Sequence, residues 1–328
     1  MMKVTGENPK VSVCVVTYNQ EKFIRECLQS IVDQETNFDF EVIVGDDCST
    51  DETQNIIREF EERYQGIIRP VFRDVNIGPT ANYFSVHNQA RGQYVAHIDG
   101  DDLMRPGKLQ KQASFLDEHP DFSMATHNMV YLENTKVVPP VSGSVDKYPE
   151  FGDVRDLFRF GCYFCHSSKM YRRSAVITNQ TPSLVVDYFL HIEHALKGNI
   201  YFSREALGVY RIHEQGITKK SEYGRLLEKA YEQAFDRGLE LGVEESIVER
   251  GKIRYRQAIA LTALKNGEPR LFKKYAIIDF EAIKYASFSQ MVLNILSVCP
   301  SVAMGVLKIR SHLNKVIKVR VTNWKRGR

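Results

Sequence analysis

The sequence predicts an α/β fold with a mostly parallel central sheet covered by helices on both faces. Short apolar runs rich in β-branched residues, such as VSVCVVT at 11–17 and FEVIVGD at 40–46, are typical of buried parallel strands. Stretches with helical spacing of apolar residues alternate with these runs, which favours helices that cross from strand to strand. With 43% hydrophobic residues in 328, the chain can bury a sizeable core.

Each expected element has its own evidence. Leu28 and Ile31 recur at helical spacing after the first strand, Asp51 marks the next helix start because acids favour a helix N-terminus, and Pro106 opens the last helix. The expected strands are 11–17, 40–46, about 67–73, 94–99 and 122–130. The expected helices are 20–34, 51–64, about 79–91 and 106–118.

The pattern changes after residue 130. Residues 131–160 contain Pro139, Pro140 and several Gly and Ser, so we expect a long loop with short elements lying over the site. From about Ser221 the sequence is helical, and the expected helices are 221–241, 244–265 and 268–284. The sequence therefore predicts a boundary near residue 218, between an α/β domain at 1–218 and a helical region at 219–328.

Charge is distributed unevenly along the chain. The net charge is +3, but no acid follows Glu281 and nine cations do, which leaves −6 on the residues up to that point. A mildly acidic body with a basic tail predicts an anionic surface as the partner of the tail and argues against a nucleic-acid-binding core. The cations of the tail are Lys284, Lys308, Arg310, Lys315, Lys318, Arg320, Lys325, Arg326 and Arg328.

The six cysteines share no regular framework, so we expect reduced thiols in a cytosolic protein. The sequence begins without the basic-then-apolar pattern of a secretory signal, and we expect none. We also expect no membrane span, because the most apolar stretch, 291–307, is interrupted by Asn294, Pro300 and two serines.

Polar residues follow three predicted strands at their carboxyl ends, where open parallel sheets bind ligands. These residues are Thr17-Tyr18-Asn19, Asp46-Asp47 and Asp99 to Asp102. The three carboxylates within 99–102 repel one another unless a cation or solvent neutralises them. Hard oxygen ligands at a strand end suit Mg²⁺ or Mn²⁺ together with a phosphate. The alternative is a solvated acidic turn before the helix that Pro106 opens.

The remaining candidates also have structural alternatives. Ser49 or Thr50 is expected to cap the helix at 51–64, although a cap does not account for two adjacent carboxylates that would accept hydrogen bonds from a base or ribose. Asp187 stands at the start of a predicted helix, either as an N-cap or as a general base. His213 follows a short predicted strand, and it becomes a metal ligand only if the chain brings it to the acidic loop.

Together these residues resemble the inverting glycosyltransferases of family 2, which have the GT-A fold. The resemblance implies that 1–218 is the catalytic domain and that 219–328 is a helical region with a basic amphipathic tail. It rests on five stretches that occur in the family's order between about residues 10 and 218. They are VSVCVVTYNQEKFIRECLQSIVDQ, FEVIVGDDCSTDET, NIGPTANYFSVHNQARGQYVAHIDGDDLMRPGKL, HSSKMYRRSA and VVDYFLHIEHALKGNIYFSREALGVYRIH.

The resemblance implies a nucleotide-sugar site at the first two strand ends. Thr17, Tyr18 and Asn19 match the lining of the base and ribose pocket, with the Tyr18 ring able to pack on the base. Asp46 and Asp47 match the acidic pair after the second strand, and Asp47 matches the carboxylate that accepts a base N–H. A family loop near the donor is matched by Asn76, Gly78 and Asn82.

The resemblance also implies the catalytic groups. Asp99 and Asp101 match the outer members of the DxD motif, so Asp99 would meet ribose or metal and Asp101 would coordinate Mn²⁺ or Mg²⁺. His213 matches a further metal ligand of some members. Asp187 matches the acid of the ED motif, the base of an inverting single displacement. The implied reaction moves a sugar from a nucleoside diphosphate, UDP by default, to a hydroxyl of a glycan or lipid-linked glycan, as in cell-surface polysaccharide synthesis.

Three positions depart from the family pattern. Val186 stands where the ED motif usually has Glu, which weakens the support of the base more than the base itself. Cys48 replaces a usual Gly. The loop 78–82 lacks the Arg common in many members, so a contact with the donor phosphate there is in doubt.

Other functional classes fit less well. The pattern CxxCH at 162–166 matches haem attachment, which needs export, and zinc would need a second Cys/His pair. No P-loop is present and no Gly-x-Gly-x-x-Gly follows residues 11–17, while a pyrophosphorylase would carry a Gly-rich basic loop there. A non-catalytic homologue that binds nucleotide or glycan stays an alternative, although it would not need Asp187. A membrane-surface scaffold that uses the tail is another.

The tail pattern favours membrane binding. An apolar stripe at helical spacing begins at Val302, with lysines on the other side and Trp324 near the end. Such a helix can lie on an anionic membrane, and the alternative is a helix packed on the protein. We therefore expect a cytoplasmic protein that is peripheral on the inner face of the plasma membrane. The stripe consists of Val302, Val306, Ile309, Leu313 and Val316.

Overall fold

The computed structural model describes residues 9–139, 145–175, 177, 187–213, 223–278 and 280–298. The tail helix expected from Val302 and the departure at Val186 lie outside these residues. The chain divides into two compact units, the first ending at Ala234 and the second beginning at Phe235. This division falls inside α7 (Tyr223–Glu240), whereas the sequence pattern changes near residue 218.

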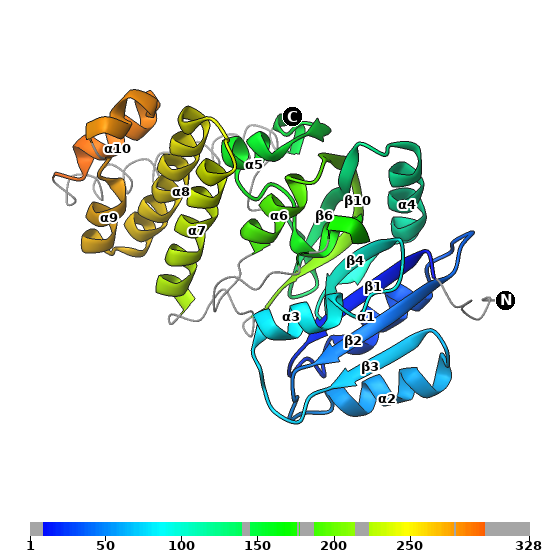
Figure 1. The fold of residues 1–328 in the computed structure, drawn as a ribbon. Helices are drawn as coiled ribbons and strands as arrows, with labels where there is room; N and C mark the ends of the chain where they lie inside the picture. The colour runs from blue at the N-terminus through cyan, green and yellow to red at the C-terminus, as the bar shows by residue number, and fades with distance from the viewer. Residues whose placement is uncertain are drawn as a thin grey trace, which may run out of the picture. The chain divides into compact units, whose positions relative to one another are not determined.

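A ten-stranded sheet forms the centre of the first unit, counted over the described residues (Figure 1). Its main order is β3-β2-β1-β4-β9-β6-β10-β5, with β7 paired to β6 and β8 to β10. Strands β1 to β4 are parallel where they pair, and so are β6 and β10, which confirms the mostly parallel sheet. The strands are β1 (Val11–Thr17), β2 (Phe40–Asp46), β3 (Ile68–Phe72), β4 (Tyr94–Asp99), β5 (Leu103–Met104), β6 (Phe122–Glu133), β7 (Lys136–Val138), β8 (Phe151–Gly152), β9 (Met170–Arg172) and β10 (Asn199–Ile212).

Helices cover both faces of this sheet, so the strands are apolar on both sides. Val13 and Val15 belong to the core that the sheet forms with α1, α2 and α4. Cys14 points to the other face, where its thiol lies 3.9 Å from the Val86 carbonyl of α3. The helices of this unit that precede α7 are α1 (Ile24–Val32), α2 (Thr53–Arg63), α3 (Pro79–His87), α4 (Lys108–Glu118), α5 (Val154–Phe160) and α6 (Asp187–Ala195).

The segment after residue 130 is more regular than expected. Strand β6 continues to Glu133, because β10 pairs with it along this length and satisfies its backbone groups. A turn at Asn134 and Thr135, both with positive φ, leads into β7. Helix α5 is opened by a capping box between Asp153 and Asp156. The short elements expected within 131–160 are therefore present, and less of the described segment is irregular than expected.

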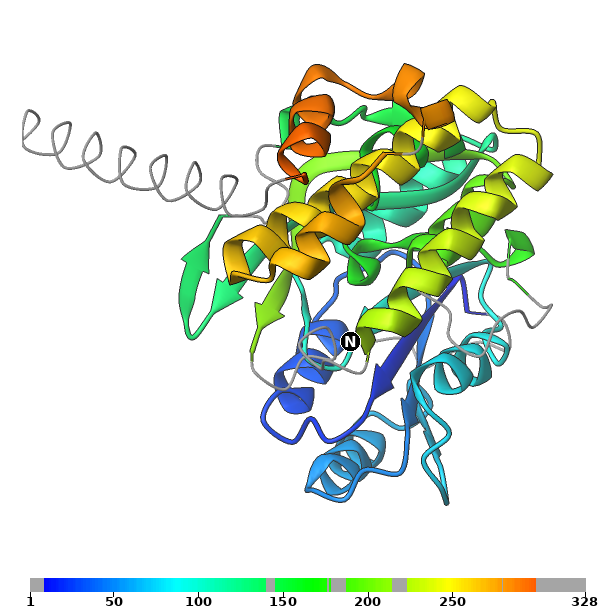
Figure 2. The same ribbon diagram turned by 90° about the vertical axis from the view of Figure 1, so that its left-hand side faces the viewer.

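The second unit is helical. Helices α8 (Glu245–Asn266) and α9 (Pro269–Ala276) pack together through a core that includes Leu264 and Phe272 (Figure 2). Gly267, with φ +76, ends α8, and Pro269 opens α9. The helix expected over 268–284 stops at Ala276, and η5 (Phe280–Tyr285) and α10 (Phe288–Leu296) follow. Among the described residues, no helix is long and apolar enough to cross a membrane.

Candidate active site

Three predicted clusters meet at one edge of the sheet. Parallel pairing aligns Thr17 with Asp46 and Val16 with Asp99, so β1, β2 and β4 end side by side. The Gly100 N–H donates to the Val16 carbonyl at 2.9 Å. A Cβ on Gly100 would lie 2.9 Å from the Thr17 side chain, which explains why the acidic loop has a glycine between its carboxylates.

Three of the four carboxylate oxygens of the acidic pair after β2 accept hydrogen bonds from the protein. Asp46 is fully buried, and its Oδ2 accepts from the Ser49 N–H at 2.9 Å, whereas its Oδ1 has no hydrogen-bond partner among the described residues. The two oxygens of Asp47 accept the consecutive N–H groups of residues 77–78 at 2.8 and 2.9 Å. Burial of Asp46 favours a structural role over the direct nucleotide contact that the sequence predicts. Cys48, where the family usually has Gly, adopts a left-handed φ of 62°, the conformation that glycine adopts without strain.

Asn19 connects β1 to the loop before α2. Its Oδ1 accepts the Thr50 N–H at 2.8 Å, and its own N–H donates to Ser49 Oγ at 2.9 Å. The sequence predicts that Ser49 or Thr50 caps α2, and this prediction was wrong. Asn19 holds Ser49 and Thr50 in the loop instead. The helix begins at Thr53, whose N–H donates to Asp51 Oδ1 at 3.0 Å.

The other nucleotide candidates differ in exposure. Thr17 is buried, whereas the Tyr18 ring is 45% exposed at the same strand end and is available to stack on a base. Asn76 donates to the Asp47 carbonyl at 3.0 Å, so it shapes the loop before α3. Asn82 is 2% exposed and its Nδ2 donates to the Gly45 carbonyl at 2.9 Å, which places it beneath the surface.

The loop after β4 concentrates charge without neutralising it. Burial, and then the charge of Asp101, raise the pKa of Asp99 to about 7. Asp102 is 1% exposed, and its Oδ1 accepts the Arg211 N–H at 3.0 Å, but its Oδ2 has no hydrogen-bond partner in the described part of the chain. Burial and the charges of Asp101 and Asp99 raise the pKa of Asp102 well above its usual range. These carboxylates are the kind that a cation would stabilise.

His213 reaches this loop from the far end of the first unit's sequence. It directly follows β10, which is longer than the short strand predicted. Its Nε2 lies 2.8 Å from Asp101 Oδ2, and its ring stands 4.4 Å from the Phe23 ring, centroid to centroid. Both polar side chains keep some exposure, 15% for His213 and 19% for Asp101. The condition set by the sequence, that the chain must bring His213 to the acidic loop, is met.

Asp187 is the first residue of α6 and faces a histidine. Its Oδ1 lies 3.8 Å from His166 Nδ1, and its side chain is 60% exposed. The surrounding protein and the charge of Asp99 raise the pKa of Asp187 to about 7, while Lys169 opposes them. An exposed carboxylate that shares the field of Asp99 has both the access and the basicity for proton transfer near neutral pH.

Two buried lysines lie beneath the carboxylates and were not predicted from the sequence. Lys108 donates its Nζ to the Ser167 carbonyl at 2.5 Å. Lys169 is fully buried, its Nζ has no hydrogen-bond partner within the described residues, and it lies 5.8 Å from the Tyr83 ring centroid. Burial lowers the pKa of each lysine to about 7. Lys169 stands in the quoted stretch HSSKMYRRSA, but only its place beside β4 brings it under the site.

A chain of buried side chains leads to Asp99 and was also not predicted. The contacts are Tyr171 Oη to His87 Nδ1 at 2.6 Å, His87 Nε2 to His97 Nδ1 at 3.0 Å, and His97 Nε2 to Asp99 Oδ1 at 3.2 Å. Burial lowers the pKa of both histidines well below 6.5, so each is neutral and has one donor and one acceptor. With Asp99 ionised, every N–H and O–H of the chain therefore points toward its carboxylate.

The carboxylates and the histidine at this loop are ligands that suit a divalent cation. Asp101 and His213 already touch, and Asp99 projects from the same loop. The mutual repulsion that raises the pKa of Asp99 is the condition that a bound cation relieves. Within the described residues, however, no three His, Cys, Asp or Glu side chains are already grouped as a metal ion requires.

An acidic site at the carboxyl ends of a mostly parallel sheet is the arrangement of an α/β fold that binds its ligand at this edge, and the solved structures described below identify it as a GT-A fold. Residues 12–178 match the model of Glycosyl transferase family 2, and the chain belongs to that family.

Similar proteins carry related names. Putative glycosyltransferase EpsE of Bacillus subtilis is 32% identical over 178 residues, which cover 53% of this chain and 60% of EpsE. Uncharacterized protein Rv1520 of Mycobacterium tuberculosis is 37% identical over 213 residues, 63% of this chain and 60% of that protein. The chain thus spans about 60% of the length of these relatives.

Solved structures agree in fold. Residues 1–349 of Staphylococcus aureus TarS, in complex with UDP-GlcNAc, superpose with a TM-score of 0.63 at 20% identity, over 90% of this chain and 89% of that one. The mannosyltransferase PcManGT of Pyrobaculum calidifontis, in complex with GDP-Man and Mn²⁺, gives 0.54 at 16% identity, over 91% and 86%. At these identities the likeness establishes the fold.

Proposed function

We propose that this protein is an inverting, metal-dependent glycosyltransferase. It would move a sugar from a nucleoside diphosphate, UDP by default, to a hydroxyl of a glycan or lipid-linked glycan, as in cell-surface polysaccharide synthesis. The observation that carries the proposal is the 2.8 Å contact of His213 with Asp101 across 112 residues, beside a loop of unneutralised carboxylates. A histidine that meets a carboxylate beside groups of raised pKa is a candidate for function rather than for structure alone.

The donor would lie across the ends of β1, β2 and β4. Tyr18 offers an exposed ring to the base, and Asp99, 38% exposed, offers a carboxylate to the ribose or the metal. Asp47 positions the loop at 77–78 through its two backbone hydrogen bonds. The TarS structures with UDP-GlcNAc and with UDP support a uridine donor, and the GDP-Man complex of PcManGT leaves guanosine as the competing base.

Asp101, His213 and Asp99 would hold Mn²⁺ or Mg²⁺. When bound, such an ion supplies positive charge to the departing diphosphate. The contribution of the chain itself is to hold these three side chains in place. His97 donates to Asp99, and Phe23 packs on the His213 ring, so neither ligand needs to be ordered at the moment of binding.

Asp187 would act as the base of a single displacement. The acceptor oxygen attacks the anomeric carbon, the bond from that carbon to the diphosphate oxygen breaks, and the nucleoside diphosphate leaves with the electron pair. Asp187 takes the acceptor proton, and the configuration inverts because no covalent intermediate forms. His166 Nδ1, 3.8 Å from Asp187 Oδ1, contacts His191 Nε2 at 3.1 Å and lines one side of the carboxylate. Base catalysis of this type contributes about 10²–10⁴-fold to the rate.

The test is Asp187→Asn, with Asp33→Asn as control, because Asp33 is an exposed carboxylate at the other end of α1 from the site. Nucleoside diphosphate release from a panel of nucleotide sugars is measured with Mn²⁺ or Mg²⁺, with and without acceptor, and nucleotide binding is measured by calorimetry. We expect Asp187→Asn to lose transfer by about 10²–10⁴-fold and to keep nucleotide binding. Full activity would remove Asp187 from this role. Nucleotide binding without any release by the native chain would favour the non-catalytic homologue.

We also propose that the protein works at the cytoplasmic face of the plasma membrane. The described residues that precede the basic tail support this proposal, because Phe288 is 78% exposed, Ile295 70% and Val298 81%. Apolar side chains beside a cationic segment suit an anionic bilayer. Flotation with anionic liposomes tests the idea, and binding that is absent or insensitive to salt would contradict it.

A further inference from the structure

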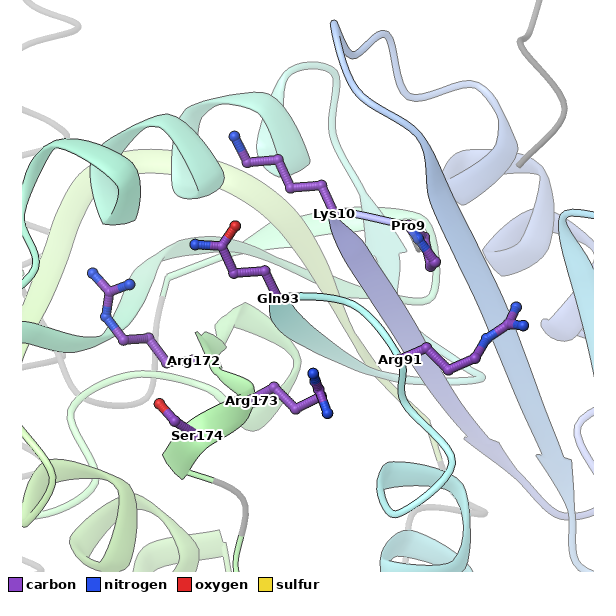
Figure 3. Close-up of a pocket in the computed structure, with 7 residues that line it drawn as sticks. All are labelled: Pro9, Lys10, Arg91, Gln93, Arg172, Arg173 and Ser174. Atoms are coloured by element: carbon purple, nitrogen blue, oxygen red, sulfur yellow. The ribbon is translucent and has the colours of Figure 1, made fainter. Parts of the chain in front are cut away.

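A basic depression of about 860 Å³ opens at the other end of the sheet from the candidate active site (Figure 3). Its wall comes from three segments: the residues before β1, those before β4, and those at the end of β9. We call it the basic pocket. Its polar lining consists of Lys10, Arg91, Gln93, Arg172, Arg173 and Ser174.

The register separates the basic pocket from the site above. Val11 pairs with Tyr94, and Tyr94 pairs with Arg172, so the pocket lies at the amino ends of β1 and β4. Thr17 and Asp99 mark the carboxyl ends of the same strands. With a rise of about 3.3 Å per residue, the two sites are roughly 20 Å apart. A ligand in the basic pocket therefore occupies a site of its own.

The charges of the basic pocket are only partly compensated. Lys10 pairs with Asp117, and Arg91 Nη2 pairs with Glu41 at 2.7 Å. The other two guanidinium groups bind carbonyls and pair with no carboxylate in the described part of the chain. Arg172 Nε donates to the Phe122 carbonyl at 2.7 Å, and Arg173 Nε donates to the Gly92 carbonyl at 2.8 Å. Arg172 Nη2 also donates to the Leu116 and His119 carbonyls at 2.6 and 2.9 Å, so Arg172 is held by the protein and Arg173 has the more available guanidinium group.

We propose that the basic pocket binds a phosphate-bearing ligand. Guanidinium forks match the oxygens of phosphate, and Gln93 and Ser174 add neutral polar groups at the rim. The volume is in the range of small-molecule sites and exceeds what one inorganic phosphate fills, so the pocket has room for a phosphate with a further group attached. A soluble phosphate ester and a phospholipid headgroup share this chemistry. The proposal does not depend on the proposed transfer reaction.

The first experiment measures binding of sodium pyrophosphate to the full chain by calorimetry, in EDTA, with and without excess UDP. The variant is Arg173→Gln, which removes one uncompensated charge from the exposed rim. Its matched control is Arg204→Gln, an exposed arginine of the same unit that does not line the pocket. Arg173→Lys keeps the charge and serves as a second variant. Thermal unfolding of each variant confirms that it is folded.

We expect saturable binding that UDP does not displace, that Arg173→Gln weakens about tenfold, and that Arg204→Gln leaves unchanged. Arg173→Lys should lose less than Arg173→Gln, and added salt should weaken binding. Equal affinity in Arg173→Gln and Arg204→Gln would overturn the proposal, and so would absence of binding or complete displacement by UDP. If Arg173→Gln does not fold, the same comparison is made between Arg173→Lys and Arg204→Lys.

A second arm separates the two sources of phosphate. The same variants are floated with vesicles of phosphatidylglycerol and phosphatidylcholine, and with phosphatidylcholine alone. A selective loss of flotation in Arg173→Gln identifies a lipid headgroup, whereas equal flotation of the variants combined with weaker pyrophosphate binding identifies a soluble ester. Since the basic tail is the same in both variants, its own membrane binding cancels in this comparison.

Discussion

The two acidic clusters at the carboxyl edge of the sheet have the same kind of sequence and different environments. After β2, both oxygens of Asp47 accept backbone N–H groups and Asp46 Oδ2 accepts the Ser49 N–H, so of these four oxygens Asp46 Oδ1 alone has no partner among the described residues. After β4, the charge of Asp101 raises the pKa of both Asp99 and Asp102, and Asp102 Oδ2 has no hydrogen-bond partner among the described residues. The first cluster builds a loop, whereas the second is left with charge that a ligand can neutralise.

The difference shows what separates a structural carboxylate from a functional one. A carboxylate whose oxygens already accept N–H groups stabilises the fold and is less available to a ligand. A carboxylate with few hydrogen-bond donors lowers the stability of the fold but is available to bind a cation. Active sites commonly trade stability for function in this way. Substitutions in the two clusters should therefore affect different quantities, and the following predictions use this contrast in order of expected effect.

Among substitutions in these two clusters, Asp101→Asn should have the largest effect on activity. Removing this carboxylate removes one proposed cation ligand, and we expect transfer to fall by about 10²–10³-fold. Thermal stability should stay the same or rise, because the repulsion with Asp99 and Asp102 is relieved. Nucleoside diphosphate release and thermal unfolding measure both effects. A large loss of stability would instead show that Asp101 stabilises the fold, as Asp47 does.

Asp47→Ala should mainly lower stability. The N–H groups of residues 77 and 78 lose their acceptors, so the free energy of unfolding should fall by roughly 2–4 kcal/mol. Urea unfolding of this variant beside Asp101→Asn makes the comparison direct. If Asp47→Ala is as stable as the native protein but fails to bind nucleotide, the contrast between the two clusters does not hold.

The pH dependence of transfer should follow the candidate base. Because the pKa of Asp187 is raised to about 7, the carboxylate gains its ionised form as pH rises, and turnover should increase about tenfold from pH 6 to pH 8. Lys169 favours the ionised form, so Lys169→Met should move the midpoint upward. Asp99 and His166 face the same group and stay in place in this variant. If the midpoint does not move, Lys169 does not influence the ionisation of Asp187.

Tyr171→Phe should have the smallest effect. It leaves His87 Nδ1 without its O–H donor, which should cost about 1 kcal/mol of stability and lower transfer severalfold by loosening the chain that ends at Asp99. Tyr163→Phe is the control, because the buried Tyr163 hydroxyl makes no hydrogen bond among the described residues. Equal effects of the two substitutions would show that the chain from Tyr171 does not position Asp99.

Much of the fold and part of the site could be predicted from local pattern. Apolar runs gave the strands β1, β2 and β4, and their register brings Thr17, Asp46 and Asp99 to one edge, as expected for a parallel sheet. The segment after residue 130 was predicted only in part: its short elements were expected, but the pairing of β6 and β8 with β10, a strand distant in sequence, was not. Pairing between distant segments leaves no local periodicity to read.

The sequence by itself determined which side chains lie at the strand ends, because chain order and period fix where a buried strand stops. Only the tertiary structure decided which of those side chains have hydrogen-bond partners within the protein. It alone brought His213 to Asp101, placed Lys169 under the carboxylates and lined up His87 and His97 behind Asp99. The physical reason is that solvation and charge in a site depend on neighbours from distant segments, and no local spacing of residues encodes those neighbours.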